Sequence, residues 1–372
     1  MRDYLKKYEV TITTKGPVYI GSGKDINKKE YYVEKNEKKI YIFDMIKFFD
    51  GISKLKLEKK YQEYLFNSKN NKNLNDFFFD NKVKKDTFLK WVDYKLDYSD
   101  IYDEKTFKNR NINTFIKESG NNIYIPGSSL KGAIRTALLT EDIIKNKNKY
   151  SNFIGKSIND TLSKKVEEVA FNTLGVSDVK KDAVNDIMSC IRVSDSEIVS
   201  KKRMMVAQRK DFKAKNKKKN GLKEEKKVLP IFYECIKPNT NIKTTITIDT
   251  SKQKDLDINR IISAIETYSN NQFENYGSKF KDVDKYSKKT LILGGYSGFV
   301  SKTVNYALYK NETVKINSNI LNGKKAFKKH KHNLDKDTFG ISPRTYKYVD
   351  FTNKLVSKNL GMGLVELSFK EI

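Results

Sequence analysis

The stretch "YIPGSSLKGAIRTALL", Tyr124–Leu139, joins a short apolar run to an amphipathic run through a Pro-Gly turn. The first run is typical of a strand, and the apolar spacing of the second run is typical of a helix. We expect Ser128 or Ser129 to cap this helix at its N-terminus. The apolar face of the predicted helix carries Leu130, Ala133, Ile134, Ala137 and Leu138. The stretch therefore predicts a strand–turn–helix unit.

The start of this helix has the composition of an anion site. Free backbone N–H groups and the helix dipole supply partial positive charge, and Lys131 and Arg135 add full charges on one face. Neither the Walker A spacing nor G-x-G-x-x-G is present, so a nucleotide cofactor is not indicated. An ordinary turn with a serine cap is the alternative. The predicted phosphate-binding residues are Gly127, Ser128, Ser129, Lys131, Gly132 and Arg135.

The charge of the chain favours a polyanionic ligand. Among 372 residues there are 74 Lys and Arg against 46 Asp and Glu, a net charge of +28. Nucleic acid suits such an excess best, an anionic membrane surface is a second candidate, and a genomic bias towards Lys and Asn needs no ligand at all. The rare arginines carry the most positional information, because guanidinium groups bind phosphate in a bidentate way. Arg192 is one of these candidates for RNA binding.

A second glycine-rich turn, "LILGGYSGFVSKTVNYAL", repeats the pattern of strand, turn and helix at Leu291–Leu308. Its tyrosine is suited to stacking on a base and its lysine to binding a phosphate. Glycines that merely allow a strand and a helix to pack closely are an equal alternative. The predicted RNA-binding residues of this turn are Gly294, Gly295, Tyr296, Gly298 and Lys302.

A basic segment at 201–227 holds 13 Lys and Arg against three acidic residues. A solvated, mobile lysine loop is the common meaning of such a run. Here apolar residues stand beside the arginines, a combination suited to insertion next to nucleic acid. We therefore add Arg203, Met204 and Arg209 to the RNA-binding residues.

Few residues are suited to catalysis or metal binding. His330 and His332 could serve as a general base in metal-independent RNA cleavage, although exposed histidines in a basic stretch are the more common case. Asp195 and Glu197 could bind a metal together, but capping or an ion pair with Arg192 is favoured over that role. The two cysteines lie far apart, so we expect no disulfide, no metal site and no cofactor. No targeting segment or membrane span is indicated, and a cytoplasmic location is expected.

The order of elements predicts an α+β protein. Strand patterns occupy Tyr8–Gly23 and Tyr31–Phe43, a helical, aromatic-rich insertion follows at about 44–118, and further strands alternate with helices to the C-terminus. Asp44 is a candidate N-cap for the insertion. The two halves show similar order, which suggests two split-βαβ units.

Several motifs, in this order, resemble the RAMP superfamily of CRISPR–Cas proteins, and among them the fifth-subunit class of type III-A (Csm) effector complexes. The motifs are "GPVYIGSG", "YIPGSSLKGAIRTALL", "IRVSDSE", "LPIFYECIKPNT" and "LGGYSGFVSKTV". The resemblance implies two tandem ferredoxin-like (RRM-like) domains, which we place at 1–228 and 229–372. It also implies that the segment at about 200–228 corresponds to the β-hairpin thumb of relatives.

The resemblance implies a function as well. Such a subunit binds crRNA without catalysis, caps the filament of RAMP backbone subunits at the crRNA 3′ end, contacts target RNA and supports 3′ maturation by recruited cellular exonucleases. The loop aspartate of target-cutting subunits is not matched, because Asp25 lies too early in "GSGKDINKKEYYV". The alternative within the same superfamily is a metal-independent CRISPR-repeat endoribonuclease that uses His330 or His332.

Overall fold

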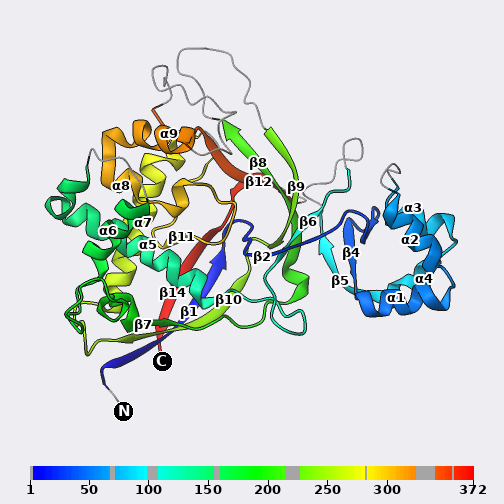
Figure 1. The fold of residues 1–372 in the computed structure, drawn as a ribbon, viewed down its shortest axis with the longest axis horizontal. Coiled ribbons are helices and arrows are strands. Elements are labelled where there is room, and N and C mark those ends of the chain that lie inside the picture. The colour runs from blue at the N-terminus through cyan, green and yellow to red at the C-terminus, as the bar shows by residue number, and fades with distance from the viewer. Residues whose placement is uncertain are drawn as a thin grey trace.

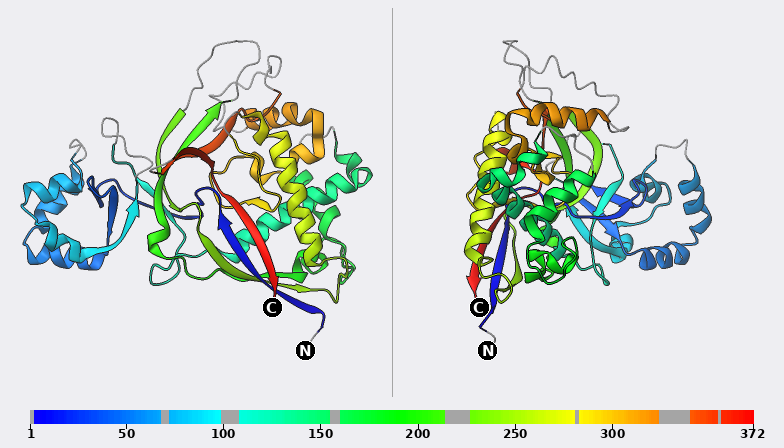
Figure 2. Two further views of the ribbon diagram at one scale, coloured as in Figure 1. Left: turned by 180° about the vertical axis from the view of Figure 1, so that it is seen from behind. Right: turned by 60° about the vertical axis from the view of Figure 1, so that its left-hand side comes forward.

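The computed structural model describes residues 3–67, 72–98, 108–154, 160–213, 227–280, 283–323, 340–353 and 356–372. The expected α+β class is confirmed: two curled sheets form the centre, with helices packed at one end and a separate helical lobe at the other (Figure 1). This arrangement is consistent with tandem ferredoxin-like domains. The N- and C-terminal ends lie close together, because the first and last strands are neighbours in one sheet (Figure 2).

The first sheet is antiparallel and has five strands. Their order is β11 (Thr290–Ile292), β14 (Leu364–Glu371), β1 (Leu5–Thr14), β10 (Asn241–Asp249) and β7 (Ile191–Val193). In β1, Val10 and Ile12 are fully buried while Thr11 and Thr13 are partly exposed. The strand pattern predicted from Tyr8 is therefore confirmed in β1, and β10 shows the same alternation of buried and more exposed residues.

Two long helices, α5 (Gly127–Lys145) and α7 (Ile258–Asn275), pack against each other and against this sheet. The predicted apolar face of α5 is confirmed, since Leu130, Ile134 and Ala137 are at most 1% exposed. Helix α7 begins after Asp257, whose side chain accepts a hydrogen bond from the backbone N–H of Arg260. The remaining helices of this end are α6 (Asp160–Phe171), α8 (Asn305–Tyr309) and α9 (Thr313–Gly323).

The second sheet is mixed and crosses the middle of the molecule. Its order is β2 (Gly21–Ile26), β6 (Ile112–Phe115), β9 (Lys227–Ile236), β8 (Met204–Lys213), β5 (Val92–Asp97), β4 (Lys39–Phe43) and β3 (Tyr31–Glu34), with β12 (Thr345–Asn353) on β8 and β13 (Val356–Gly361) on β12. The strand pattern predicted at Tyr31–Phe43 is confirmed, and it forms the antiparallel pair β3 and β4. The flanks of the basic segment form the antiparallel pair β8 and β9, and residues 214–226 lie outside the described ranges.

The predicted insertion is helical in its first part only. Its helices are α1 (Met45–Lys54), α2 (Glu58–Phe66), α3 (Leu74–Asp80) and α4 (Lys85–Phe88). Asp44 caps α1 by accepting hydrogen bonds from two backbone N–H groups, as expected. The residues of β5 and β6 were wrongly assigned to helix, because both strands pair within the second sheet. The helices enclose an aromatic core of their own, which includes Phe48, Phe78 and Trp91.

Two details of the strand–turn–helix units differ from expectation. Before α5, the predicted strand is reduced to isolated bridges at Ile123, and Pro126 occupies the N-cap position without a side-chain cap, so neither Ser128 nor Ser129 caps the helix. After the second glycine turn, the chain forms the 3₁₀ turn Val300–Lys302 and the five-residue α8 in place of one helix. In both units, part of the strand or helix predicted from the local pattern is therefore irregular in the structure.

The sheets exchange strands between the two halves of the chain. Strand β1 pairs with β10 and β14, which come from the C-terminal half. Strand β9 runs through the boundary between residues 228 and 229. The division into 1–228 and 229–372 stays a prediction, and both sheets draw strands from each side of it.

Candidate nucleic-acid interface

The first glycine turn, at Gly127, is hydrogen-bonded to a distant part of the chain. The backbone N–H of Gly127 donates a 2.7 Å hydrogen bond to Oδ1 of Asp195, in the loop after β7. A Cβ on Gly127 would lie 2.2 Å from the carbonyl oxygen of Val193, so only glycine fits here. Glu197 accepts a hydrogen bond from the backbone N–H of Lys243. The Asp195 carboxylate thus caps the start of α5, and the Glu197 carboxylate joins the loop after β7 to β10.

The next residues of the turn face solvent. Ser128 and Gly132 are exposed, Ser129 is half-buried, and a Cβ on Gly132 would meet no atom within 4 Å. Lys131 is half-buried; loss of water lowers its pKa, a change opposed by Asp186 and reinforced by Arg135. An ammonium group that has lost part of its hydration gains more from an anionic partner. Ser128, Lys131 and Gly132 are therefore available to a phosphate.

Arg135 already has protein partners. Its Nε donates to Glu167 Oε2 at 3.0 Å, its Nη1 donates to Asp186 Oδ2 at 2.7 Å, and its guanidinium lies 4.1 Å from the centre of the Phe171 ring. These contacts tie α5 to α6 and to the segment before β7. The structure thus gives Arg135 an internal role, and an RNA contact by this residue stays a prediction.

The second glycine turn is held against the chain after β1. The backbone N–H of Gly295 donates to the carbonyl oxygen of Tyr19 at 2.7 Å, and a Cβ on Gly294 would lie 2.0 Å from the same oxygen. Gly294 and Gly298 have φ angles of 76° and 105°, a region that favours glycine. Here the glycines serve the close approach of two backbones, the alternative that the sequence left open.

Tyr296 lies in this turn and forms a cluster with two other tyrosines, Tyr19 and Tyr233. Its φ angle of 57° is unusual for a non-glycine residue, and the residue is 43% exposed. Its ring centre lies 4.4 Å from that of Tyr233 and 5.3 Å from that of Tyr19. Burial raises the pKa of Tyr233 to about 12. Sequence reasoning missed Tyr19 and Tyr233, because their contact needs the pairing of distant segments.

Arg209 joins this cluster from β8. Its guanidinium carbon lies 5.6 Å from the centre of the Tyr296 ring, and its Nε lies 3.5 Å from Oδ1 of Asp211. Within the described protein, three buried polar atoms here have no hydrogen-bond partner: Arg209 Nε, Asp211 Oδ1 and the Tyr233 hydroxyl. Such atoms beside an exposed aromatic ring suit a polar, planar ligand.

The other predicted residues of the β8 region divide by exposure. Arg203 is exposed in a 3₁₀ turn, and Arg192 is exposed on the edge strand β7. Met204 is 1% exposed, and an RNA contact by this residue stays a prediction. Strand β8 is buried on both faces here: Met204 and Val206 enter the main core, while Met205 and Ala207 enter the tyrosine-containing core.

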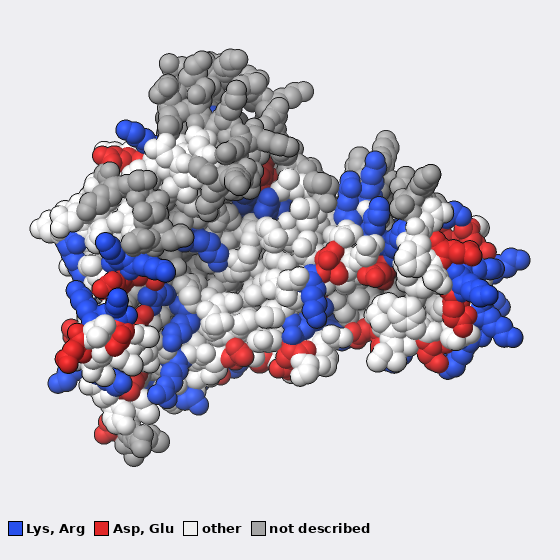
Figure 3. Space-filling view, in the orientation of Figure 1, with Lys and Arg blue, Asp and Glu red and all other residues white. Residues whose placement is uncertain are grey.

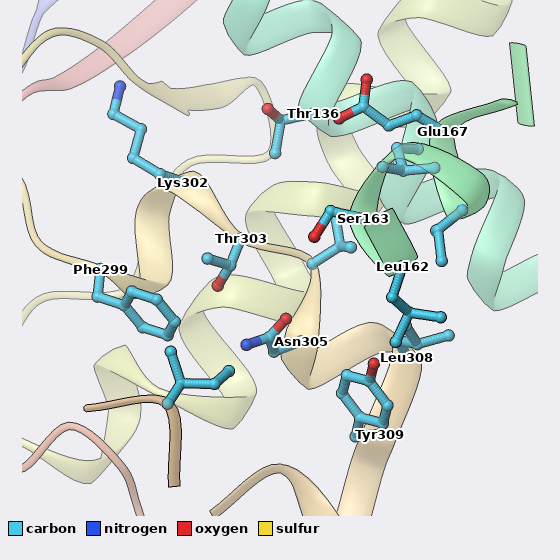
Figure 4. A pocket seen from close by; sticks show the side chains of 14 residues that line it. Thr136, Leu162, Ser163, Glu167, Phe299, Lys302, Thr303, Asn305, Leu308 and Tyr309 are labelled. Carbon is cyan, nitrogen blue, oxygen red and sulfur yellow. The ribbon is translucent and has the colours of Figure 1, made fainter. Parts of the chain in front are cut away.

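Lys302 stands at the rim of a 340 Å³ pocket between α5, α6 and α8 (Figure 4). Solvent reaches its side chain, yet the pocket wall removes enough water to lower the pKa of the ammonium group. Across the pocket lie Thr136 and Glu167, the latter bound to Arg135. The described residues give Lys302 no ion pair, which leaves it available to a phosphate.

On the face seen in Figure 3, Lys and Arg side chains gather on the left-hand body beside a broad central area with few charges. Lysines and acidic residues are mixed on the helical lobe at the far right. His330 and His332 lie outside the described residues. In the described part of the chain, no group of three or more His, Cys, Asp or Glu side chains could hold a metal ion. None of the helices in that part has the length and apolar character of a membrane span.

Known proteins match most of the chain. A protein of Streptococcus thermophilus named "CRISPR system Cms protein Csm5" is 27% identical over 318 residues, which cover 82% of each chain. The protein of the same name from Enterococcus italicus is 25% identical over 395 residues, covering 96% of this chain and 91% of that one.

Solved structures share the fold. A chain in the cryo-EM structure of a Csm-crRNA-target RNA ternary complex of a type III-A CRISPR-Cas system matches with a TM-score of 0.59 and 18% identity, covering 97% of this chain and 100% of that one. The crystal structure of T. onnurineus Csm5 matches with a TM-score of 0.59 and 17% identity, covering 96% and 99%. These matches confirm the resemblance seen in the sequence. The family model of the RAMP superfamily matches residues 11–302, and the chain belongs to that superfamily.

Proposed function

We propose that this chain is a non-catalytic RNA-binding subunit of a type III-A (Csm) effector complex. In this proposal it caps the filament of backbone subunits at the crRNA 3′ end, contacts crRNA and target RNA, and supports 3′ maturation by cellular exonucleases in the cytoplasm. The observation that carries the proposal is the match of nearly the whole chain to relatives named Csm5, and to a chain of a Csm–crRNA–target RNA complex.

The described residues support an RNA interface made of exposed groups. Lys131 and Lys302 are partly desolvated cations without an ion pair in the described chain, and Arg203 is exposed. Tyr296 offers an exposed ring for a base, with Arg209 beside it. Contacts of this kind bind phosphate and stack on bases without reading sequence, as a guide-binding subunit requires.

Salt dependence tests the electrostatic part of this proposal. For single-stranded nucleic acid, the slope of log K against log salt is about −0.7 for each phosphate neutralised. We expect Lys131→Ala and Lys302→Ala each to make the slope less steep by about that amount. Lys54→Ala, on the helical lobe, is the control, because that lysine pairs with Asp50 on its own helix. Equal slopes in all variants would refute the assignment of these two lysines.

Assembly in cells tests the complex itself. The tagged chain should co-purify with other Csm subunits and with RNA that contains CRISPR spacers, as measured by mass spectrometry and RNA sequencing. Recovery of the chain without spacer RNA would contradict the proposal. Incubation of the purified chain with repeat RNA in EDTA separates it from the endoribonuclease alternative: a discrete cleavage product would exclude a non-catalytic role.

A further inference from the structure

A second pocket, of 480 Å³, is lined by donors and by no acid among the described residues. It lies between the C-terminal part of α5, the second half of α7, α8 and the start of α9. The polar side chains that line it are those of Lys147, Lys279, Lys310, Asn271, Asn275, Asn311 and Tyr306. Its volume lies in the range of small-ligand sites, about 300–1,000 Å³.

Asn271 supplies a buried donor without a partner. The residue is 8% exposed, and its Oδ1 accepts a hydrogen bond of 3.0 Å from Nδ2 of Asn275. That bond fixes the orientation of the amide, and Nδ2 of Asn271 is left buried with no hydrogen-bond partner in the described chain. A buried amide donor without a partner costs about 1–3 kcal/mol, so an acceptor at this position would be stabilising.

Lys147 and Lys310 bring like charges together at the same pocket. Lys147 and Lys310 both line the pocket, and the charge of Lys147 lowers the pKa of Lys310. The backbone of Lys310 also has a φ angle of 45°, which is uncommon for a residue with a side chain. Lysines on a protein surface normally spread apart, whereas an anion between them turns their repulsion into attraction.

We propose that this pocket is a phosphate-binding site, in which Lys147, Lys310 and the Asn271 amide hold the phosphate oxygens. Lys279 lies at the same rim and accommodates a second phosphate. The site is separate from Tyr296 and Lys131, shares no lining residue with the Lys302 pocket, and does not depend on the proposed function. The phosphate belongs either to a free nucleotide or to an RNA strand, and both present the same chemistry.

Calorimetry and thermal melting of the full chain test the site at about 150 mM salt, where surface attraction is screened. The probes are pyrophosphate, ATP and a short single-stranded RNA. We expect saturable binding of pyrophosphate or ATP, a raised Tm, and at least about tenfold weaker binding after Lys147→Ala with Lys310→Ala. The control is Lys59→Ala with Lys60→Ala, which removes the same charge from exposed positions of α2.

Binding of the short RNA shows whether the phosphate in the pocket belongs to RNA or to a free nucleotide. If the Lys147→Ala, Lys310→Ala variant also loses RNA affinity at least tenfold relative to the control, the ligand is an RNA phosphate; if RNA binding is unchanged, it is a free nucleotide. Both outcomes support a phosphate site. Equal binding of every probe by this variant and the control, or no saturable binding of any probe, would overturn it.

A second variant distinguishes ligand binding from a structural role. Asn271→Asp keeps the acceptor for Asn275 and places a carboxylate among the three lysines. We expect it to raise the Tm without ligand and to weaken pyrophosphate binding at least about tenfold, because the carboxylate takes the place of the anion. A lower Tm with unchanged pyrophosphate affinity would contradict the proposal.

Discussion

The backbone N–H of Gly127, at the first turn of α5, donates its hydrogen bond to the carboxylate of Asp195 in the loop after β7. This backbone N–H of the glycine turn therefore already has a partner within the protein. The carboxylate occupies the place that a phosphate takes at other helix N-termini, and it is favoured there by the same helix dipole. The strand–turn–helix motif thus fixes the start of α5 on the first sheet, and the solvent-facing residues after it remain for a ligand.

The two glycines of this motif should respond in opposite ways to alanine. Gly127→Ala places a methyl group 2.2 Å from a carbonyl oxygen, and we expect a loss of about 1–3 kcal/mol in the free energy of unfolding. Gly132→Ala has open space inside a helix, and we expect a gain of about 0.5–1 kcal/mol. Urea unfolding of both variants measures the difference. If RNA approaches the exposed side of Gly132 as proposed, this more stable variant binds crRNA less tightly; unchanged affinity would remove Gly132 from the interface.

Arg135 should matter first for stability. Its partly exposed guanidinium bonds to Glu167 and Asp186, and we expect Arg135→Ala to cost about 1–2 kcal/mol in urea unfolding. The matched control is Lys54→Ala, which removes an exposed i, i+4 pair worth about 0.3–0.5 kcal/mol. A cost no larger than that of the control would show that the two bonds contribute little. RNA experiments with Arg135 variants therefore need a parallel measurement of folding.

Particular residues show which parts of the fold can be predicted from the sequence and which cannot. The period of Val10 and Ile12 predicts β1 correctly, because one face of that strand is buried and the other is not. Four consecutive buried residues in β8, from Met204 to Ala207, show no such period, since the strand lies between two cores. The apolar residues beside arginines in the basic segment suggested instead an exposed wedge that inserts next to nucleic acid. The pairing of β1 with β10 and β14, and the bridge between Val18 and Ile236 that lies beside the contact of Tyr19 with Tyr233, join residues more than two hundred positions apart.

Residue types at the candidate site were predicted better than their partners. Tyr296 is exposed as its predicted role requires, and Lys302 stands at a pocket rim. Nothing in the order of residues tells that Gly127 meets Asp195 or that Arg135 meets Glu167, because each pair is formed by tertiary packing.

Tyr296→Asn separates a role in RNA stacking from a role in folding. Asn adopts a positive φ more readily than Tyr, a gain of about 1 kcal/mol that offsets part of the lost contacts with Tyr19 and Tyr233, each worth about 0.5–1.5 kcal/mol. We expect the Tm to fall modestly and the free energy of RNA binding to weaken by about 1–3 kcal/mol for one stacked base. Phe79→Asn, which removes an aromatic ring that is 84% exposed on the helical lobe, is the control. Fluorescence anisotropy with crRNA measures both variants, and equal affinities would exclude Tyr296 as a stacking residue.

A buried ion pair lies within the second sheet and reaches β5, the strand that follows the helices of the lobe. Glu234 on β9 is fully buried, accepts the backbone N–H of Phe115 at 2.9 Å, and accepts a hydrogen bond from Lys117 at 3.0 Å. Lys117 also donates to the hydroxyl of Tyr94 on β5 at 2.7 Å, and burial followed by the charge of Glu234 raises the pKa of Tyr94 well above its usual value. The phenol therefore stays protonated at neutral pH, and one lysine links β5, β6 and β9.

Removing Lys117 alone should lower the free energy of unfolding more than replacing both Lys117 and Glu234. Lys117→Ala leaves the Glu234 carboxylate buried without its cation, and we expect a loss of about 3–5 kcal/mol in the free energy of unfolding. Lys117→Met combined with Glu234→Gln keeps an acceptor for Phe115 and removes both charges, so its loss should be smaller. A double-mutant cycle of Lys117→Met, Glu234→Gln and their combination in urea measures the coupling, and hydrogen exchange should show faster opening of β5 and β6 in Lys117→Ala. If the double variant lost as much as the sum of both single variants, the two charges would be uncoupled.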